Sequence, residues 1–177
     1  MAIVNANYMA SALKGEYDVV YTGETGRVGH EMILDLRHFR KEFGGVECAD
    51  IARRLMDYGF HAPTLSFPVH ETLMVEPTES EPKAELDRFM EALVAIKHEC
   101  EEIRDGKADI DDNVVKMAPH TAAESISDSW SHPYSREKAV FPLPWIRESK
   151  FFPYVTKIDG GYGDRNLQCT CDPLYEE

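Results

Sequence analysis

The sequence predicts an α+β fold, with one antiparallel or mixed sheet, helices on one face of that sheet, and a tail rich in proline and aromatic residues. Segments with helical and strand periodicity follow in the order helix, strand, strand, helix, strand, helix, and a glycine-containing loop joins the first two strands. From residue 113 onward the composition changes, because the last 65 of the 177 residues hold 6 of the 10 prolines and 9 of the 18 aromatic residues. Proline at that density excludes long helices and central strands. We therefore expect a small α+β domain over residues 1–112 and an ordered, wrapping tail over residues 113–177.

The start of the chain predicts a helix and a hairpin. Apolar residues recur at helical spacing within residues 2–14, and Gly15 suits the end of that helix. No residue precedes Met1 to serve as an N-cap, as expected if a longer chain had been cut here. Two β-rich segments follow within residues 17–36. The glycines in the loop between them favour a turn, so we expect an antiparallel hairpin.

The middle of the chain predicts two more helices around one strand. A helix is expected over residues 47–58, because its apolar residues share one face and Gly59 can end it. A strand follows at residues 72–75. The longest helix is expected over residues 82–104, where apolar residues keep a 3.6-residue period and charged residues fill the other face. The residues expected to form the core are Ile51, Leu55, Leu86, Phe89, Leu93 and Ile96 from the helices, and Val20, Leu34 and Met74 from the sheet.

The charge balance excludes several classes of function. With 19 basic and 32 acidic residues the net charge is −13, the wrong sign for a phosphate backbone, so no nucleic-acid partner is expected. Most of the excess lies in residues 76–112, which indicates a solvated acidic helix rather than a cation site. No apolar stretch is long enough to span a membrane, and no secretory signal is seen at the start. Four cysteines in a chain of this length favour a reducing compartment.

Four segments contain residue types that often carry chemistry. His30 and Glu31 are neighbours in an expected strand and point to opposite faces, so an edge or interface histidine is the alternative to a catalytic one. Residues 61–64 form a rigid, non-helical segment that either presents His61 to a ligand or is only structural. One residue separates Cys169 from Cys171 and no second pair exists, so no metal site is expected. The glycine-rich residues 160–165 lack the context of a phosphate loop and are expected to form a turn.

Seven distinctive segments lie in order along nearly the whole chain: Asn5–Met9, His30–Arg37, Asp57–Thr64, Leu73–Glu81, Ala84–Phe89, Pro133–Glu137 and Tyr162–Leu167. Together they resemble the C-terminal part of glycine decarboxylase, the P-protein of the glycine cleavage system. The resemblance implies the small C-terminal domain of a pyridoxal-phosphate enzyme of the aspartate-aminotransferase fold, fold type I. In that enzyme glycine loses carbon dioxide on the cofactor, and the aminomethyl group passes to the lipoylated H-protein.

The resemblance also implies partners and a place in the cell. The partners are the large pyridoxal-phosphate-binding domain of the same enzyme and the lipoylated H-protein, and the complete enzyme is expected to be a dimer. The compartment is expected to be the bacterial cytoplasm or the mitochondrial matrix.

The cofactor is expected on the missing large domain. None of the nine lysines here follows a histidine, as the family's Schiff-base lysine does, and the family's glycine-rich cofactor segment is missing. We expect no catalytic, cofactor-binding or metal-binding residue in this chain, and no activity from it alone. Because the small domain of this fold lines the mouth of the active site, the substrate-channel candidates are His30, His61, Thr64 and Arg165. The alternative is an interaction or structural module that kept the fold and lost catalysis.

Overall fold

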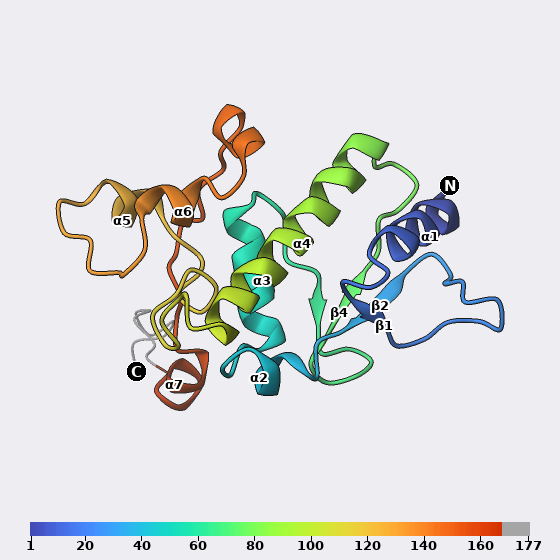
Figure 1. The fold of residues 1–177 in the computed structure, drawn as a ribbon, viewed down its shortest axis with the longest axis horizontal. Coiled ribbons are helices and arrows are strands. Elements are labelled where there is room, and N and C mark those ends of the chain that lie inside the picture. The colour runs from blue at the N-terminus through green and yellow to red at the C-terminus, as the bar shows by residue number, and fades with distance from the viewer. Residues whose placement is uncertain (168–177) are drawn as a thin grey trace, which may run out of the picture.

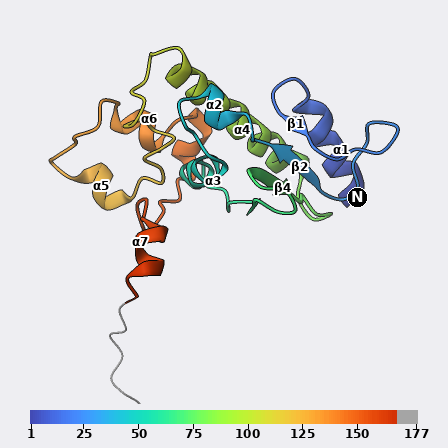
Figure 2. The same cartoon turned by 90° about the horizontal axis from the view of Figure 1, so that it is seen from below.

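The computed structural model describes residues 1–167 and has an α+β architecture (Figure 1). Its sheet has the strand order β1-β2-β4-β3. All three strand pairs are antiparallel, so the sheet is antiparallel and not mixed. Figure 2 shows α2 and α4 on one side of β2 and β4. The strands are short: β1 Asp18–Val19, β2 Met32–Asp35, β3 Thr64–Leu65 and β4 Thr72–Val75.

The register of the sheet decides which of its residues reach the core. Leu34 pairs with Leu73, and both side chains are completely buried. Met74, which we expected in the core, pairs with Ile33 and therefore lies on the opposite face of the sheet. Val20 lies beyond the end of β1 and is only half-buried. Of the three sheet residues expected in the core, only Leu34 is found there.

The first two strands pair as expected, but over fewer residues. Only β1 and β2 are paired within the expected hairpin, residues 17–36. The loop between them packs on the first helix instead of extending the ladder. The side-chain amide of Asn7 donates to the carbonyl oxygen of Val28 (2.9 Å), and the Val28 N–H donates back to Asn7 Oδ1 (3.0 Å). Asn7 thus occupies the backbone groups that a strand partner would use.

The helices cover the inner face of the sheet. The expected first helix, residues 2–14, ends two residues earlier than predicted, and a single-turn helix after β2 was not predicted. Glu47 and Asp50 form a capping box at the start of α3. All the expected helical core residues are buried except Phe89, which is half-buried against the core. The helices are α1 Ala2–Ala12, α2 Phe39–Glu42, α3 Cys48–Asp57 and α4 Lys83–Arg104. No helix within residues 1–167 is long and apolar enough to cross a lipid bilayer.

The part of the tail that the structure describes folds into short helical segments (Figure 1). Each has five or six residues, as the proline content predicts. They are α5 Ala122–Ile126, α6 Arg136–Val140, the 3₁₀ helix η1 Pro144–Glu148, and α7 Gly160–Arg165.

A buried charge joins this tail to the domain. Arg54 of α3 is completely buried and pairs with Asp57 (Nη1–Oδ2 2.8 Å) and Glu99 (Nη2–Oε1 2.7 Å). Its guanidinium also donates to the carbonyl oxygens of Ala139 (2.6 Å) and Lys138 (2.9 Å). A buried charge has no water around it, so it needs all of these hydrogen-bond partners. The tail therefore completes the core and is not an appendage to it.

Candidate functional site

One cleft brings together two of the four candidate residues. It has a volume of about 460 Å³ and lies between the loop after α3, the end of β4 and the start of α4. His61 and Thr64 line it, and both are exposed. His30 lies beside it, because its Nε2 is 3.7 Å from Oε1 of Glu76, another lining residue. We call this the His61 cleft.

Arg165 lies elsewhere. It is on α7, which Figure 1 and Figure 2 both show apart from the sheet. The turn expected at residues 160–165 is a short helix, because Oδ1 of Asp159 accepts a hydrogen bond from the Tyr162 N–H (2.8 Å) and caps it. Within this chain Arg165 therefore does not meet the two histidines.

The end of α3 sets the position of the His61 loop. Gly59 has φ +86°, a left-handed conformation that suits glycine. Its N–H donates to the Met56 carbonyl (3.0 Å), and the next N–H, of Phe60, donates to the Leu55 carbonyl (3.0 Å). This pattern ends the helix and turns the chain sharply toward β3.

Aromatic residues that were not among the site candidates hold the same loop. The Phe60 ring packs edge-on against Phe89 (centroids 5.2 Å apart) and Trp145 (6.2 Å). The guanidinium of Arg88 lies over the Phe60 and Trp145 rings, 5.6 and 4.3 Å from their centroids. Trp145 comes from the tail, so its contact with the loop has no local sequence signal beyond the high aromatic content there.

The lining of the His61 cleft is apolar and acidic. Leu86 and Phe89 supply apolar walls, and Glu76 and Glu81 supply exposed carboxylates. Glu85 is paired with Arg88 (2.6 Å). Among the residues that the structure describes, no lysine or arginine lines the cleft. Such a lining favours an apolar or cationic group over a phosphate or carboxylate.

His30 does not form a catalytic pair in this chain. Its Nε2 is 3.9 Å from Glu31 and 3.7 Å from Glu76, and more than half of the imidazole is exposed. Contacts at these distances in water are weak. His30 thus lies near the His61 cleft without being fixed there.

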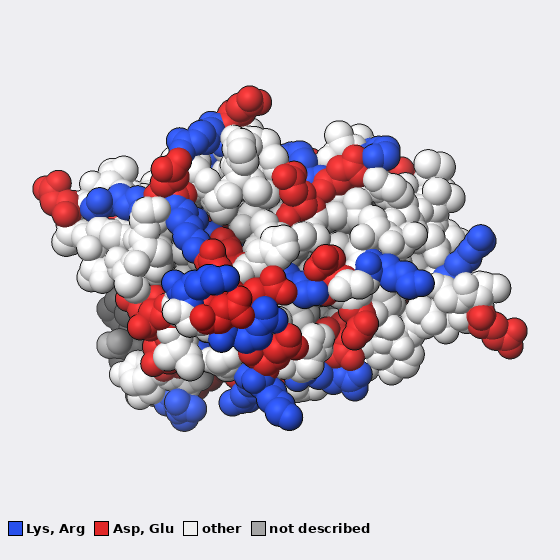
Figure 3. Space-filling model, viewed as in Figure 1, with Lys and Arg blue, Asp and Glu red and all other residues white. Residues whose placement is uncertain are grey.

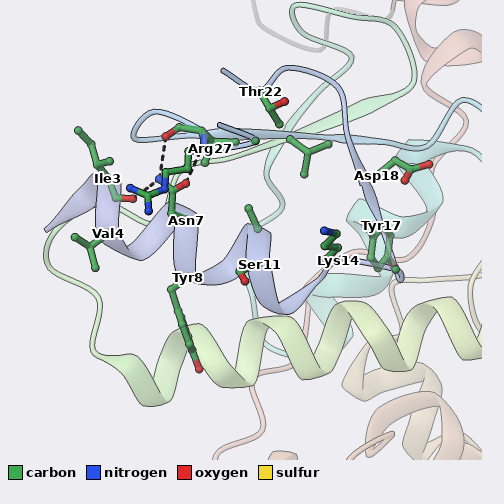
Figure 4. A pocket seen from close by; sticks show the side chains of 15 residues that line it. Ile3, Val4, Asn7, Tyr8, Ser11, Lys14, Tyr17, Asp18, Thr22 and Arg27 are labelled. Atoms are coloured by element: carbon green, nitrogen blue, oxygen red, sulfur yellow. Dashed lines mark hydrogen bonds between the residues drawn. The ribbon is translucent and has the colours of Figure 1, made fainter. Parts of the chain in front are cut away.

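A second, larger cleft of about 810 Å³ lies between α1 and the segment that follows it (Figure 4). Ile3 and Val4 expose apolar surface there, and Asn7 closes one side by holding Val28. None of the four candidates lines this cleft. The sequence signal for this contact with the loop was Asn7 itself, a polar residue that stands at the helical spacing of core residues.

Neither cleft fits pyridoxal phosphate. The exposed carboxylates of the His61 cleft would repel the phosphate. Exposed Lys14 and Arg27 line the second cleft, but a Schiff-base lysine needs an amine shielded from water, which Lys14 does not have. Burial lowers the pKa of Lys150 to about 8, but its Nζ donates to the Asp57 carbonyl (2.5 Å) and lines neither cleft. The described residues therefore do not hold this cofactor, and no step through it is assigned to them.

A histidine–carboxylate pair does exist in the core. Nδ1 of His120 is 2.8 Å from Oδ2 of Asp57, and its Nε2 is 3.0 Å from the Tyr134 hydroxyl. His120 and Asp57 are both completely buried. Because His120 lies in the tail and Asp57 ends α3, the pair links the tail to the domain.

Metal ligands give no further site. Among residues 1–167, no group of three or more His, Cys, Asp or Glu side chains is placed to hold a metal ion. Cys169 and Cys171 lie outside the described residues.

The fold and the clefts define a small α+β domain with an open binding cleft and, within residues 1–167, no residues that fit the cofactor. Residues 1–120 match the family model described as the C-terminal domain of glycine dehydrogenase. The chain belongs to this family.

Known relatives are similar in sequence to this chain over nearly its whole length. The glycine dehydrogenase (decarboxylating) of Nostoc punctiforme is 58% identical over 174 residues, that of Flavobacterium johnsoniae 59% over 173, and that of Dechloromonas aromatica 56% over 174. Each comparison covers 98% of this chain but only 18% of the relative. The chain thus spans less than a fifth of the length of the relatives that it matches.

Proposed function

We propose that this chain acts as the C-terminal domain of a glycine dehydrogenase (decarboxylating) and needs a lysine-bearing large domain for activity. The observation that carries the proposal is the similarity, over 98% of the chain, to enzymes of that name. The described residues support it independently, since they form clefts but do not fit the cofactor.

In the complete enzyme, pyridoxal phosphate on the large domain would supply the electron sink for decarboxylation, and the lipoylated H-protein would accept the aminomethyl group. The complete enzyme is proposed to be a dimer. Its proposed compartment is the bacterial cytoplasm or the mitochondrial matrix.

The His61 cleft is the part of this chain proposed to face the substrate path. Its walls are partly apolar, and its exposed carboxylates, Glu76 and Glu81, attract ammonium groups and repel anions. The amine of glycine is cationic at neutral pH and its carboxyl group is anionic, whereas the aminomethyl group that remains after decarboxylation carries the amine without the carboxylate. In this proposal His61 and Thr64 line the path, and neither is a catalytic residue.

A chimera tests the proposal. This chain replaces the matching 18% of the Nostoc punctiforme enzyme, and the intact Nostoc enzyme is the positive control. With pyridoxal phosphate and lipoylated H-protein, we expect the chimera to exchange labelled bicarbonate into the carboxyl group of glycine. The chain alone should give no exchange.

Two results would contradict the proposal. A chimera that folds and binds the cofactor but shows no exchange would favour a module that has lost catalysis. Exchange by the chain alone would make one of its own lysines catalytic.

A further inference from the structure

Residues 151–167, which we call the arm, expose apolar side chains that the domain does not cover. Figure 2 shows α7 and the segment before it extending away from the body. Tyr154 is 90% exposed and Leu167 is 88% exposed. The other large apolar side chains exposed on the arm are Phe151, Val155, Ile158 and Tyr162. Soluble monomers rarely expose so much apolar surface in one segment, which marks the arm as a contact surface.

The base of the arm is fixed on the domain. Lys157 Nζ donates to the Lys116 carbonyl (2.8 Å) and lies 3.3 Å from Oδ1 of Asp50. Just before the arm, Lys150 donates to the Asp57 carbonyl at the end of α3, and within the arm Pro153 is buried. These contacts set the direction of the arm, so docking it costs little additional ordering.

The arm leaves the body on one particular side. In Figure 2 α7 and the segment before it extend away from α2 and α4. Charged side chains crowd the face formed by α4 (Figure 3). Ion pairs there, such as Lys83 with Asp87, are exposed, and covering them would require desolvation. The exposed apolar side chains of the arm, and not the charged face formed by α4, therefore mark the docking surface.

We propose that the arm docks on the lysine-bearing remainder of the enzyme, with Tyr154, Ile158 and Tyr162 as its main apolar contacts. The alignment with the Nostoc punctiforme enzyme leaves out only 177 − 174 = 3 residues, so the arm belongs to the shared sequence. The other 100 − 18 = 82% of that enzyme is the polypeptide that covers it. This inference rests on the proposed function and adds the surface that joins the two parts. When the arm is docked in this way, Arg165, which lies on it, is brought to the large domain.

Amide hydrogen exchange in the chimera tests the docking. We expect amides of the arm to exchange at least tenfold more slowly in the chimera than in the chain alone, equivalent to about 1.4 kcal/mol. The double variant Tyr154→Ser/Ile158→Ser should restore fast exchange. The matched control is Ile126→Ser, because Ile126 is 82% exposed on α5, outside the arm. That control should keep the protection.

The outcomes separate this inference from the proposed function. Fast exchange of the arm in a catalytically active chimera would overturn the docking and leave the function standing. Slow exchange of the arm in an inactive chimera would support the docking and reject the function. Protection that already appears in the chain alone and grows with its concentration would identify a second copy as the partner and overturn the docking on the large domain.

Discussion

Arg54 carries a charge that never reaches solvent, and its acceptors come from separate parts of the chain. Its guanidinium donates five hydrogen bonds, to carboxylates on α3 and α4 and to two carbonyl oxygens of α6. A buried ion pair of this kind adds little stability over an apolar replacement of the whole group, but losing one partner leaves a buried charge unpaired. This single side chain thus pairs with two buried carboxylates and also fixes the position of the tail.

Replacing Arg54 alone should therefore be costly. We expect Arg54→Leu to lower the free energy of unfolding by about 3–5 kcal/mol, because Asp57 and Glu99 stay buried without their partner. The measurement is urea unfolding at neutral pH. The matched control is Arg40→Leu, since Arg40 is largely exposed at 3.4 Å from Glu47 and its loss should cost less than about 1 kcal/mol. Equal losses in the two variants would contradict the role given to Arg54.

Lys150 should make stability rise with pH in the mildly alkaline range. Burial lowers its pKa to about 8 in the folded chain, against about 10.4 in an unfolded one. Between these values the unfolded state binds more protons, so the free energy of unfolding increases as pH rises. We expect the free energy of unfolding of the wild type to rise relative to that of Lys150→Met as the pH increases from 8 to 10. Urea unfolding at each pH measures this difference. A constant difference across that range would count against the shifted pKa.

Single residues also show where the sequence was informative. Leu73, Met74 and Val75 form an apolar run, and such a run does not state which of its members faces the core. We placed Met74 there, whereas the register buries Leu73. For the site, the proximity of His61 and Thr64 followed from their place in one short segment. The position of Arg165 depends on how the tail crosses the domain, which no local pattern encodes.

At the scale of elements, strong periodicity was the best guide. The sequence located α1, α3, β4 and α4 to within two residues, because the helices have a clear apolar face or a glycine at the end and β4 is a short apolar run. It missed α2 and β3, which are too short to show a period and depend on tertiary contacts for their hydrogen bonds. It also missed that α7 is helical, since the Asp159 cap outweighs the glycines that follow.

The 3₁₀ helix η1 is expected to stabilise the His61 loop through one aromatic ring. Trp145→Leu removes the ring that contacts both Phe60 and the Arg88 guanidinium. We expect amides of residues 60–64 to exchange severalfold faster in this variant, by the loss of about 0.5–1.5 kcal/mol of aromatic contact.

The matched control for Trp145 is Trp130→Leu. Trp130 lies in the same tail but packs against His120, His132 and Tyr134, not the loop. Exchange of residues 60–64 should stay unchanged in this control. Equal acceleration in the two variants would show that the loop responds to tail stability as a whole.

At the scale of the whole molecule, the composition change at residue 113 is not expected to mark where the folding unit ends. Arg54 and Asp57 find partners at Lys138, Ala139 and His120, all beyond that point. A fragment of residues 1–112 would keep the buried charges of Arg54 and Asp57 but lose these hydrogen-bond partners. The unit that satisfies its own buried groups therefore extends through the tail helices to the base of the arm.

Truncation tests this directly. We expect residues 1–158, which keep the Lys157 anchor, to unfold cooperatively at a temperature close to that of the whole chain. Residues 1–112 should lack a cooperative thermal transition by circular dichroism. A sharp transition in the shorter fragment, at the temperature of the full chain, would show that the sheet and its helices need nothing from the tail.

The position of Arg54 also has a consequence for synthesis on the ribosome. Arg54 emerges 85 residues before the Ala139 carbonyl that accepts its hydrogen bond. At about 5–20 residues per second, the ribosome needs roughly 4–17 s to make that interval. During this time α3 carries an arginine whose two carbonyl acceptors on α6 do not yet exist, so the packing over this charge is incomplete. The nascent domain is therefore expected to stay loosely packed, and open to chaperones, until the tail has left the exit tunnel.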